Sequence, residues 1–172
     1  MEKRKGAAKS KSVKATAPEN MIRSASPKAA RMILELGVFL DEALLKLFMP
    51  YFSQETSDRE QQYVRLREVV LAHVNAMQAL YHLPSLGQPI DLSIVYMEFQ
   101  AKTPATLPTY EGERGALLDS FCAYQRKLNK PSDKDSEHWD MALYLSGLDF
   151  FANEGGRRNF VTMGMLCLSD RR

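Results

Sequence analysis

The chain has 172 residues, of which 45% are hydrophobic and 26% charged, and its formal net charge at pH 7 is +2. This length predicts a single domain, and this composition permits both a buried core and a water-exposed surface. No run of about 18 apolar residues is present, which argues against a membrane-spanning helix. The basic N-terminus lacks the apolar segment that a secretion signal needs, so the sequence as it stands predicts a cytosolic polypeptide.

Residues 1–30 are rich in Lys, Ser, Ala and Pro and contain few large apolar side chains. Such a segment buries too little surface to offset the entropy lost on ordering, so we expect a disordered basic tail. Its densest basic stretch, Lys3-Arg4-Lys5, would suit nucleic acid or a nuclear address. Aromatic residues do not interleave with these charges, and this argues against nucleic-acid binding.

Residues 31–40 (RMILELGVFL) form an almost continuous apolar run, which predicts a central strand covered on both faces. One acid, Glu35, interrupts this run. A carboxylate inside a buried strand is costly unless it is paired or bound to a metal. Glu35 is therefore a candidate cation ligand, or else it lies at an exposed end of the strand. Asp41 then caps a short amphipathic helix, which Pro50 should kink or end.

Residues 57–60 (SDRE) match a capping box with Ser57 at the N-cap, and they open the longest helix, which stops near His82. A turn at residues 85–89 leads into a second strand at residues 90–100. A strand, crossover helices and a returning strand imply a right-handed β-α-β unit with a parallel strand pair.

The C-terminal part begins with a loop at residues 102–115, in which Pro and Gly recur. Apolar residues at helical spacing predict a third helix over residues 117–128, and the short apolar run 141–145 predicts a third, buried strand. Residues 153–158 then predict a hairpin-like turn, and residues 159–165 an edge strand.

An acidic loop at residues 132–140 joins the third helix to the third strand. Its carboxylates are those of Asp133, Asp135, Glu137 and Asp140. Because Ca²⁺ binds several oxygens held by a flexible loop, this cluster is a candidate site for a hard cation. The alternative interpretation is a solvated turn in which His138 and Trp139 pack back on the core.

Most of the familiar catalytic motifs are absent from the sequence. There is no Gly-rich phosphate loop, no Gly-x-Ser-x-Gly, no Cys-x-x-Cys and no His-Glu-x-x-His. The three histidines do not have the spacing of zinc ligands; they are His73, His82 and His138. The residues by themselves therefore show no catalytic set.

Four segments occur in an order that a known family shares: ILELGVFLDEAL, AMQALYHLPSLGQPIDLSIV, LLDSFCAYQRKLNKPSDKDSEHWDMALYLSGLDF and TMGM. Over residues 31–165 the chain resembles the N-terminal half of a reprolysin-type (adamalysin-like) zinc metalloprotease domain. It looks closest to the branch called disintegrin and metalloproteinases with thrombospondin motifs. The resemblance implies a truncated peptidase domain at residues 31–168, and the basic tail at residues 1–30 has no counterpart in the family.

The resemblance also implies an α/β fold: a twisted, mostly parallel sheet with an antiparallel edge strand and helices on both faces. The family's structural calcium ligands correspond to Glu35, Asp133 and Asp140. Its edge strand, which pairs with an extended substrate peptide by strand addition, corresponds to Thr162, Met163, Gly164 and Met165. The alternative is that these four residues are only the rim of a sheet.

The resemblance further implies a disulfide. The family's cysteine on the third helix corresponds to Cys122, and its partner lies shortly after the edge strand. Cys167 is the one remaining cysteine of this sequence, although it follows Met165 more closely than the family's spacing. A Cys122–Cys167 bond would need oxidising conditions.

Catalysis is where the sequence departs from the family. The family holds Zn²⁺ with three histidines, two of them one helical turn apart, and the Glu between activates a water molecule. None of these four residues is found here, so we expect no peptide hydrolysis by this chain alone. Three hypotheses follow. The first is a partial zinc metalloendopeptidase domain, whose full-length relatives are secreted and hydrolyse extracellular proteins. The second is a catalytically inactive product that binds peptides or partners at its edge strand. The third is a basic-tailed module that binds nucleic acid.

Overall fold

The structure, a computed structural model, describes residues 31–154, 157–160 and 165–168. Its elements, in chain order, are β1 (Met32–Leu40), α1 (Glu42–Glu55), α2 (Arg59–Tyr81), the short 3₁₀ turn η1 (Pro84–Leu86), β2 (Ile90–Phe99), a second such turn η2 (Tyr110–Gly112), α3 (Arg114–Leu128), β3 (Met141–Leu145), β4 (Phe151–Glu154), β5 (Arg157–Phe160) and β6 (Met165–Leu168). None of the described helices is long and apolar enough to cross a membrane.

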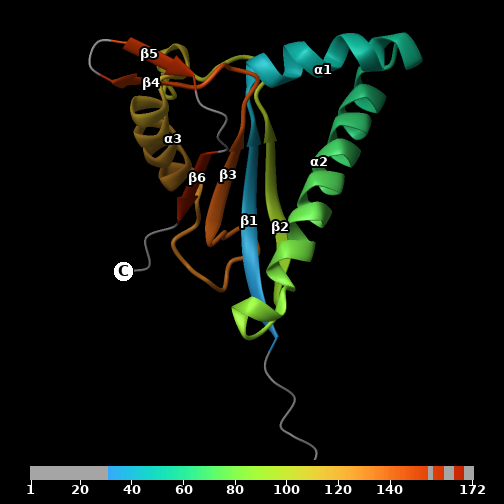
Figure 1. Ribbon diagram of the computed structural model, residues 1–172. Coiled ribbons are helices and arrows are strands. Elements are labelled where there is room, and N and C mark those ends of the chain that lie inside the picture. Colours follow the sequence, from blue (N-terminus) through green and yellow to red (C-terminus); the bar gives the residue numbers. More distant parts are fainter. Residues whose placement is uncertain (1–30, 155–156, 161–164, 169–172) are drawn as a thin grey trace, which may run out of the picture. The chain divides into compact units, whose positions relative to one another are not determined.

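The main sheet has four strands in the order β2-β1-β3-β6. Strands β2 and β3 both run parallel to β1, whereas β6 pairs antiparallel with β3 at the edge. Figure 1 shows α1 and α2 on one side of this sheet and α3 on the other. The predicted α/β fold, a mostly parallel sheet with an antiparallel edge strand and helices on both faces, is therefore confirmed.

Strand β1 lies at the centre because it is apolar on both faces. Its alternate residues Leu36, Val38 and Leu40 pack in one cluster with buried side chains of α2, while Phe39 packs in a second cluster with side chains of α3. Within β1, Gly37 lies under the indole of Trp139, and a Cβ there would be 2.8 Å from Trp139 Cδ2. The sheet thus separates two cores, and glycine is needed where the indole crosses β1.

Helix α1 begins at Asp41, as predicted. The Asp41 carboxylate accepts hydrogen bonds from the backbone N–H of Leu44 at 2.7 Å and of Gly147 at 3.1 Å, and also from the Ser146 hydroxyl. Pro50 lies inside the helix, which continues to Glu55. The proline therefore does not end α1.

Helix α2 begins one residue later than the capping box predicts. Its N-cap is Asp58, not Ser57, and the Asp58 carboxylate accepts from the Glu60 N–H at 2.9 Å. The Thr56 hydroxyl in turn accepts from the Asp58 N–H at 3.2 Å. Asp is as good an N-cap as Ser, so the sequence pattern could not separate the two positions.

The edge strand lies further along the chain than predicted. Residues 159 and 160 belong to β5, which pairs with β4 in a separate two-stranded sheet, so the hairpin predicted at residues 153–158 is formed. The strand that borders β3 is β6, which shares only Met165 with the predicted range 159–165. The position of a four-residue strand depends on its pairing with a distant segment, and local periodicity in the sequence does not predict that position.

Candidate cation site

The candidate site lies where the acidic loop enters β3. Asp140, the residue before β3, is bound to β1 twice: its N–H donates to the Glu35 carbonyl at 3.0 Å, and its Oδ2 accepts from the Glu35 N–H at 3.2 Å. This double contact continues the β1–β3 pairing and holds the Asp140 carboxylate beside the sheet. The position of this carboxylate is therefore set by tertiary structure.

The loop itself is attached to the end of α3 by a side-chain amide. Asn129 donates through Nδ2 to the Trp139 carbonyl at 2.8 Å and accepts through Oδ1 from the Trp139 N–H at 3.1 Å. The Trp139 indole is 1% exposed and donates through Nε1 to Gln125 Oε1 at 2.8 Å. Trp139 thus packs into the core, as the solvated-turn interpretation expected, and the two residues that flank it are presented beside the loop.

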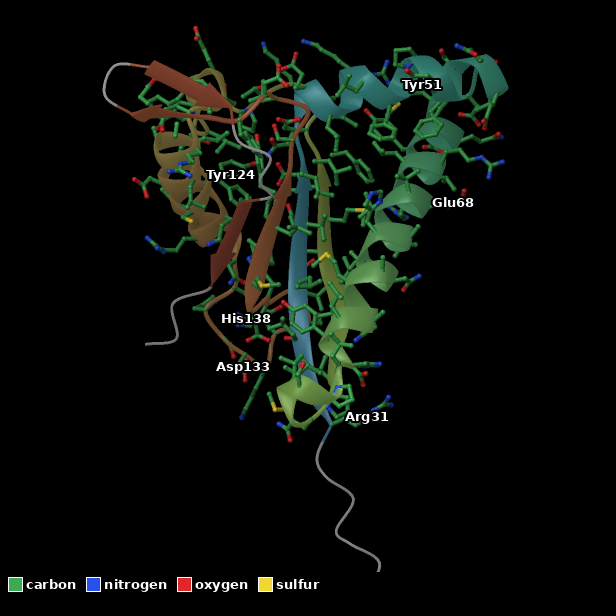
Figure 2. The ribbon with its side chains drawn as sticks, in the orientation of Figure 1. Arg31, Tyr51, Glu68, Tyr124, Asp133 and His138 are labelled. Atoms are coloured by element: carbon green, nitrogen blue, oxygen red, sulfur yellow. The ribbon has the colours of Figure 1, made fainter. Side chains whose placement is uncertain are left out.

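His138 is one of those two flanking residues, and one nitrogen of its ring is already occupied. Its Nδ1 lies 2.6 Å from the Lys130 carbonyl oxygen, which can only accept, so Nδ1 carries the proton of the neutral ring. The other nitrogen, Nε2, lies 3.8 Å from Asp133 Oδ1, and it presents a lone pair when the ring is neutral. Figure 2 shows Asp133 and His138 together on the loop below β3.

The described residues include one group of side chains arranged as metal ligands: Asp133, His138 and Asp140 each offer one ligand atom, and these atoms lie within 4.8 Å of one another. The structure therefore brings together two of the three predicted ligands, Asp133 and Asp140. Glu35 adjoins Asp140 through its main chain, and its carboxylate is not part of the group.

His138 was missed as a ligand, although the sequence carries a signal for it. It stands two residues before Asp140, and where a chain enters a strand, residues two apart point to the same side. The other two loop acids are used within the loop: Asp135 Oδ1 accepts from the Glu137 N–H at 3.0 Å, and the Glu137 carboxylate lies 3.6 Å from Lys130 Nζ.

The predicted substrate strand falls mostly outside the described residues. Thr162, Met163 and Gly164 lie there, and Met165 begins β6 opposite Tyr144. Peptide binding at this edge stays a prediction.

The structure describes the side chain of only one of the two cysteines in the predicted disulfide. Cys122 packs against the core between α3 and the sheet and is disulfide-bonded. Cys167 lies in β6 opposite Ala142, but its side chain is outside the described part of the chain. The Cys122–Cys167 pairing therefore stays a prediction.

A second polar cluster, on β2 and α3, is structural in character. The Glu98 carboxylate accepts from the hydroxyls of Tyr124 at 2.7 Å and Tyr96 at 3.0 Å, and from Gln100 Nε2 at 2.9 Å. Burial, reinforced by the neighbouring Glu98, raises the pKa of Tyr96 to about 12. Both tyrosines thus remain protonated donors, and the cluster ties α3 to β2.

Comparison with known proteins gives a consistent set of relatives. No family model matches the chain. The chain is 34% identical over 129 residues, 73% of its length, to "A disintegrin and metalloproteinase with thrombospondin motifs adt-1" of Caenorhabditis elegans. It is 34% identical over 84 residues, 49% of its length, to the relative numbered 15 in that series from Mus musculus, and 30% identical over 90 residues, 52% of its length, to the one numbered 8 from Homo sapiens. These alignments cover 8%, 9% and 10% of the three relatives, so the chain spans only a small part of each.

Proposed function

We propose that this chain, which carries a metalloproteinase region related to the disintegrin and metalloproteinases with thrombospondin motifs, supplies the N-terminal part of a zinc metalloendopeptidase domain. The observation that carries the proposal is the 34% identity with the nematode relative over 129 residues. The sheet order β2-β1-β3-β6, with one antiparallel edge strand, supports it because this is the architecture that the family resemblance implies.

The residues present do not fit the catalytic zinc site of that family. The sequence has no His-Glu-x-x-His, and its three histidines are on separate elements. His73 in α2 contacts the Val69 carbonyl at 2.8 Å, and His82 at the end of α2 contacts Asp91 at 3.0 Å, whereas His138 is in the acidic loop. We therefore expect no hydrolysis by this chain alone, and no catalytic residue is assigned to it.

The calcium site is the second part of the proposal. Asp133 and Asp140 lie within ligand distance of one another, and Asp140 is hydrogen-bonded to the main chain of Glu35. Three bidentate carboxylates would supply up to about six of the six to eight oxygens that Ca²⁺ takes, with water or carbonyls supplying the rest. A calcium ion bound there would connect β1 to the loop before β3. Its role would be structural.

The substrate-binding role is assigned to the outer edge of β6. In the described sheet, β6 is the last strand beyond β3, so one of its edges is not paired with any described strand. An extended peptide could add to such an edge through main-chain hydrogen bonds. For the protease domain that this chain contributes to, we propose protein substrates in an extracellular setting, with Met165 and the three residues before it as the contact.

A chimaeric protease tests the main proposal. Residues 31–168 would replace the matching part of the catalytic domain of the nematode relative, and cleavage of a protein substrate would be followed with zinc present. We expect cleavage by the chimaera and none by the 172-residue chain. The matched control is the same chimaera without its catalytic Glu. A chimaera that folds but does not cleave would contradict the proposal.

A second candidate, favoured by the absent zinc motif, is a catalytically inactive product that binds peptides at β6. The transcript separates the two candidates. An in-frame His-Glu-x-x-His-x-x-Gly-x-x-His downstream of codon 172 would establish the partial protease, and a stop codon confirmed there in mature messenger RNA would favour the inactive product.

A further inference from the structure

The group that the structure assembles in the acidic loop contains an imidazole, and calcium does not account for it. Ca²⁺ takes oxygen ligands, whereas neutral imidazole suits zinc, copper, iron and nickel. From the arrangement of these side chains we propose that Asp133, His138 and Asp140 bind a divalent transition cation of the zinc and cobalt type, with Nε2 of His138 as the nitrogen ligand.

The orientation of His138 is that of a metal-ligating histidine. Such residues donate their second ring N–H to a backbone carbonyl or a carboxylate, which fixes the tautomer and the ring. His138 does so through Nδ1, 2.6 Å from the Lys130 carbonyl oxygen. Its side chain is only 13% exposed, so the packing around it also restricts the ring. The ring is thus held with Nε2 3.8 Å from Asp133 Oδ1.

The pair formed by His138 and Asp133 needs only a small closure to bind one ion. Two ligands that are each about 2.0 to 2.1 Å from a tetrahedral ion lie about 3.3 Å apart. Nε2 of His138 and Oδ1 of Asp133 are 3.8 Å apart, so this pair would have to approach by about half an ångström. The Asp133 side chain is 83% exposed and can make that movement. His138 is the restrained ligand and Asp133 the adjustable one.

Charge and ligand count also fit. The two carboxylates would neutralise a divalent ion, and together with one imidazole they form a three-ligand set that leaves a fourth, tetrahedral position for water. The third ligand distinguishes the two cation types, because the proposed calcium set uses Glu35 and the transition-metal set uses His138. The inference shares Asp133 and Asp140 with the proposed calcium site, but it does not depend on calcium binding or on protease activity.

Metal titrations of the untagged full chain test the inference. Co²⁺ would be followed by its visible absorption and Zn²⁺ by calorimetry. We expect one ion per chain. The bound Co²⁺ should give an intense visible absorption band, which indicates a low coordination number. His138→Gln keeps an N–H donor for the Lys130 carbonyl but removes the imidazole, and it should lower the cobalt affinity at least about tenfold.

The chain offers a matched control. His82 also faces a carboxylate, with Nε2 3.0 Å from Asp91 Oδ1, but it is not part of the three-ligand group, so His82→Gln should leave cobalt affinity unchanged. If His138→Gln fails to fold by circular dichroism, Asp133→Asn, which alters an exposed side chain, should show the same loss. The inference is overturned if the wild-type chain binds no cobalt, or if folded His138→Gln or Asp133→Asn binds it as tightly as wild type. A separate calcium titration of wild type and Glu35→Gln tests the calcium proposal, so failure of one is distinguishable from failure of the other.

Discussion

Asp41 and Asp133 are carboxylates at opposite ends of the same sheet, and their surroundings differ in kind. Asp41, after β1, is 2% exposed and accepts from two backbone N–H groups and the Ser146 hydroxyl. Asp133, before β3, is 83% exposed and faces a histidine nitrogen at 3.8 Å. A carboxylate surrounded by donors of the protein stabilises the fold, whereas an exposed one beside a histidine nitrogen is placed to share a cation in the proposed site. The neighbours of an aspartate therefore determine whether it stabilises the fold or is available for a cation.

The largest effect is expected at Asp41. Asp41→Ala removes the cap of α1 and leaves the partly buried donors of Ser146 and Gly147 without their acceptor, so it should lower the free energy of unfolding by about 3 kcal/mol. Denaturant unfolding measures this. Asp58→Ala, at the exposed N-cap of α2, is the control and should cost about 1 kcal/mol. Equal losses would remove the distinction between the two kinds of carboxylate.

Loss of Asp133, one of the three proposed calcium ligands, should remove the calcium response. At a free concentration about 100 times Kd, calcium should raise the free energy of unfolding by about 2.7 kcal/mol, and Asp133→Ala should abolish this increase. Without calcium, the same variant should unfold like wild type, because its side chain is 83% exposed. Thermal unfolding with calcium or chelator measures both. Asp119→Ala, on the exposed face of α3, should keep the calcium response; loss of the response there, or its persistence in Asp133→Ala, would contradict the site.

One methyl group added at Gly37, in the sheet between the two cores, should destabilise the protein. Gly37→Ala would place a Cβ 2.8 Å from the Trp139 ring, and overpacking of this kind costs about 1–3 kcal/mol. Because Trp139 lies between His138 and Asp140, the variant should also weaken cation binding. Gly115→Ala, in the first turn of α3 with its nearest contact at 3.5 Å, is the control and should be neutral or stabilising. A Gly37→Ala protein as stable as wild type would show that the indole has room to move.

The smallest effect on stability is expected at Glu42. Hydrogen-bond donors of the protein surround this carboxylate near the surface. The Lys46 ammonium, followed by the Thr103 N–H and hydroxyl, lowers the pKa of Glu42 to about 2 from an ordinary value of 4.5. Because the folded pKa is depressed, the stabilisation is present above pH 4.5 and is lost as pH falls toward 2. Melting temperatures of wild type and Glu42→Gln should therefore differ at neutral pH and converge near pH 2. A constant difference across this range would contradict the assignment.

The main elements could be predicted from local patterns. The apolar run of β1, the period of α2 and the short run of β3 each bury a face that their own residues define, so periodicity was sufficient. The resemblance then supplied the antiparallel edge. The position of that edge was wrong, because β6 is a four-residue strand whose place depends on pairing with β3.

The site was only partly predictable for a similar reason. Clustering in the sequence singled out the acidic loop with its four carboxylates, and the family resemblance then selected Asp133 and Asp140 among them. Neither could show that Nε2 of His138 lies 3.8 Å from Asp133, because that depends on Asn129 and on the burial of Trp139.

The sequence by itself determined which segments form helices and strands, which faces they bury and which family they resemble, because these follow from side chains a few residues apart. Only the tertiary structure decided which polar groups meet: that the main chain of Glu35 joins Asp140 and that His138 lies with Asp133 and Asp140. Such contacts need distances of a few ångströms, and the Glu35–Asp140 hydrogen bonds join residues that are 105 positions apart in sequence. Such distances exist only once the two cores have packed against the sheet.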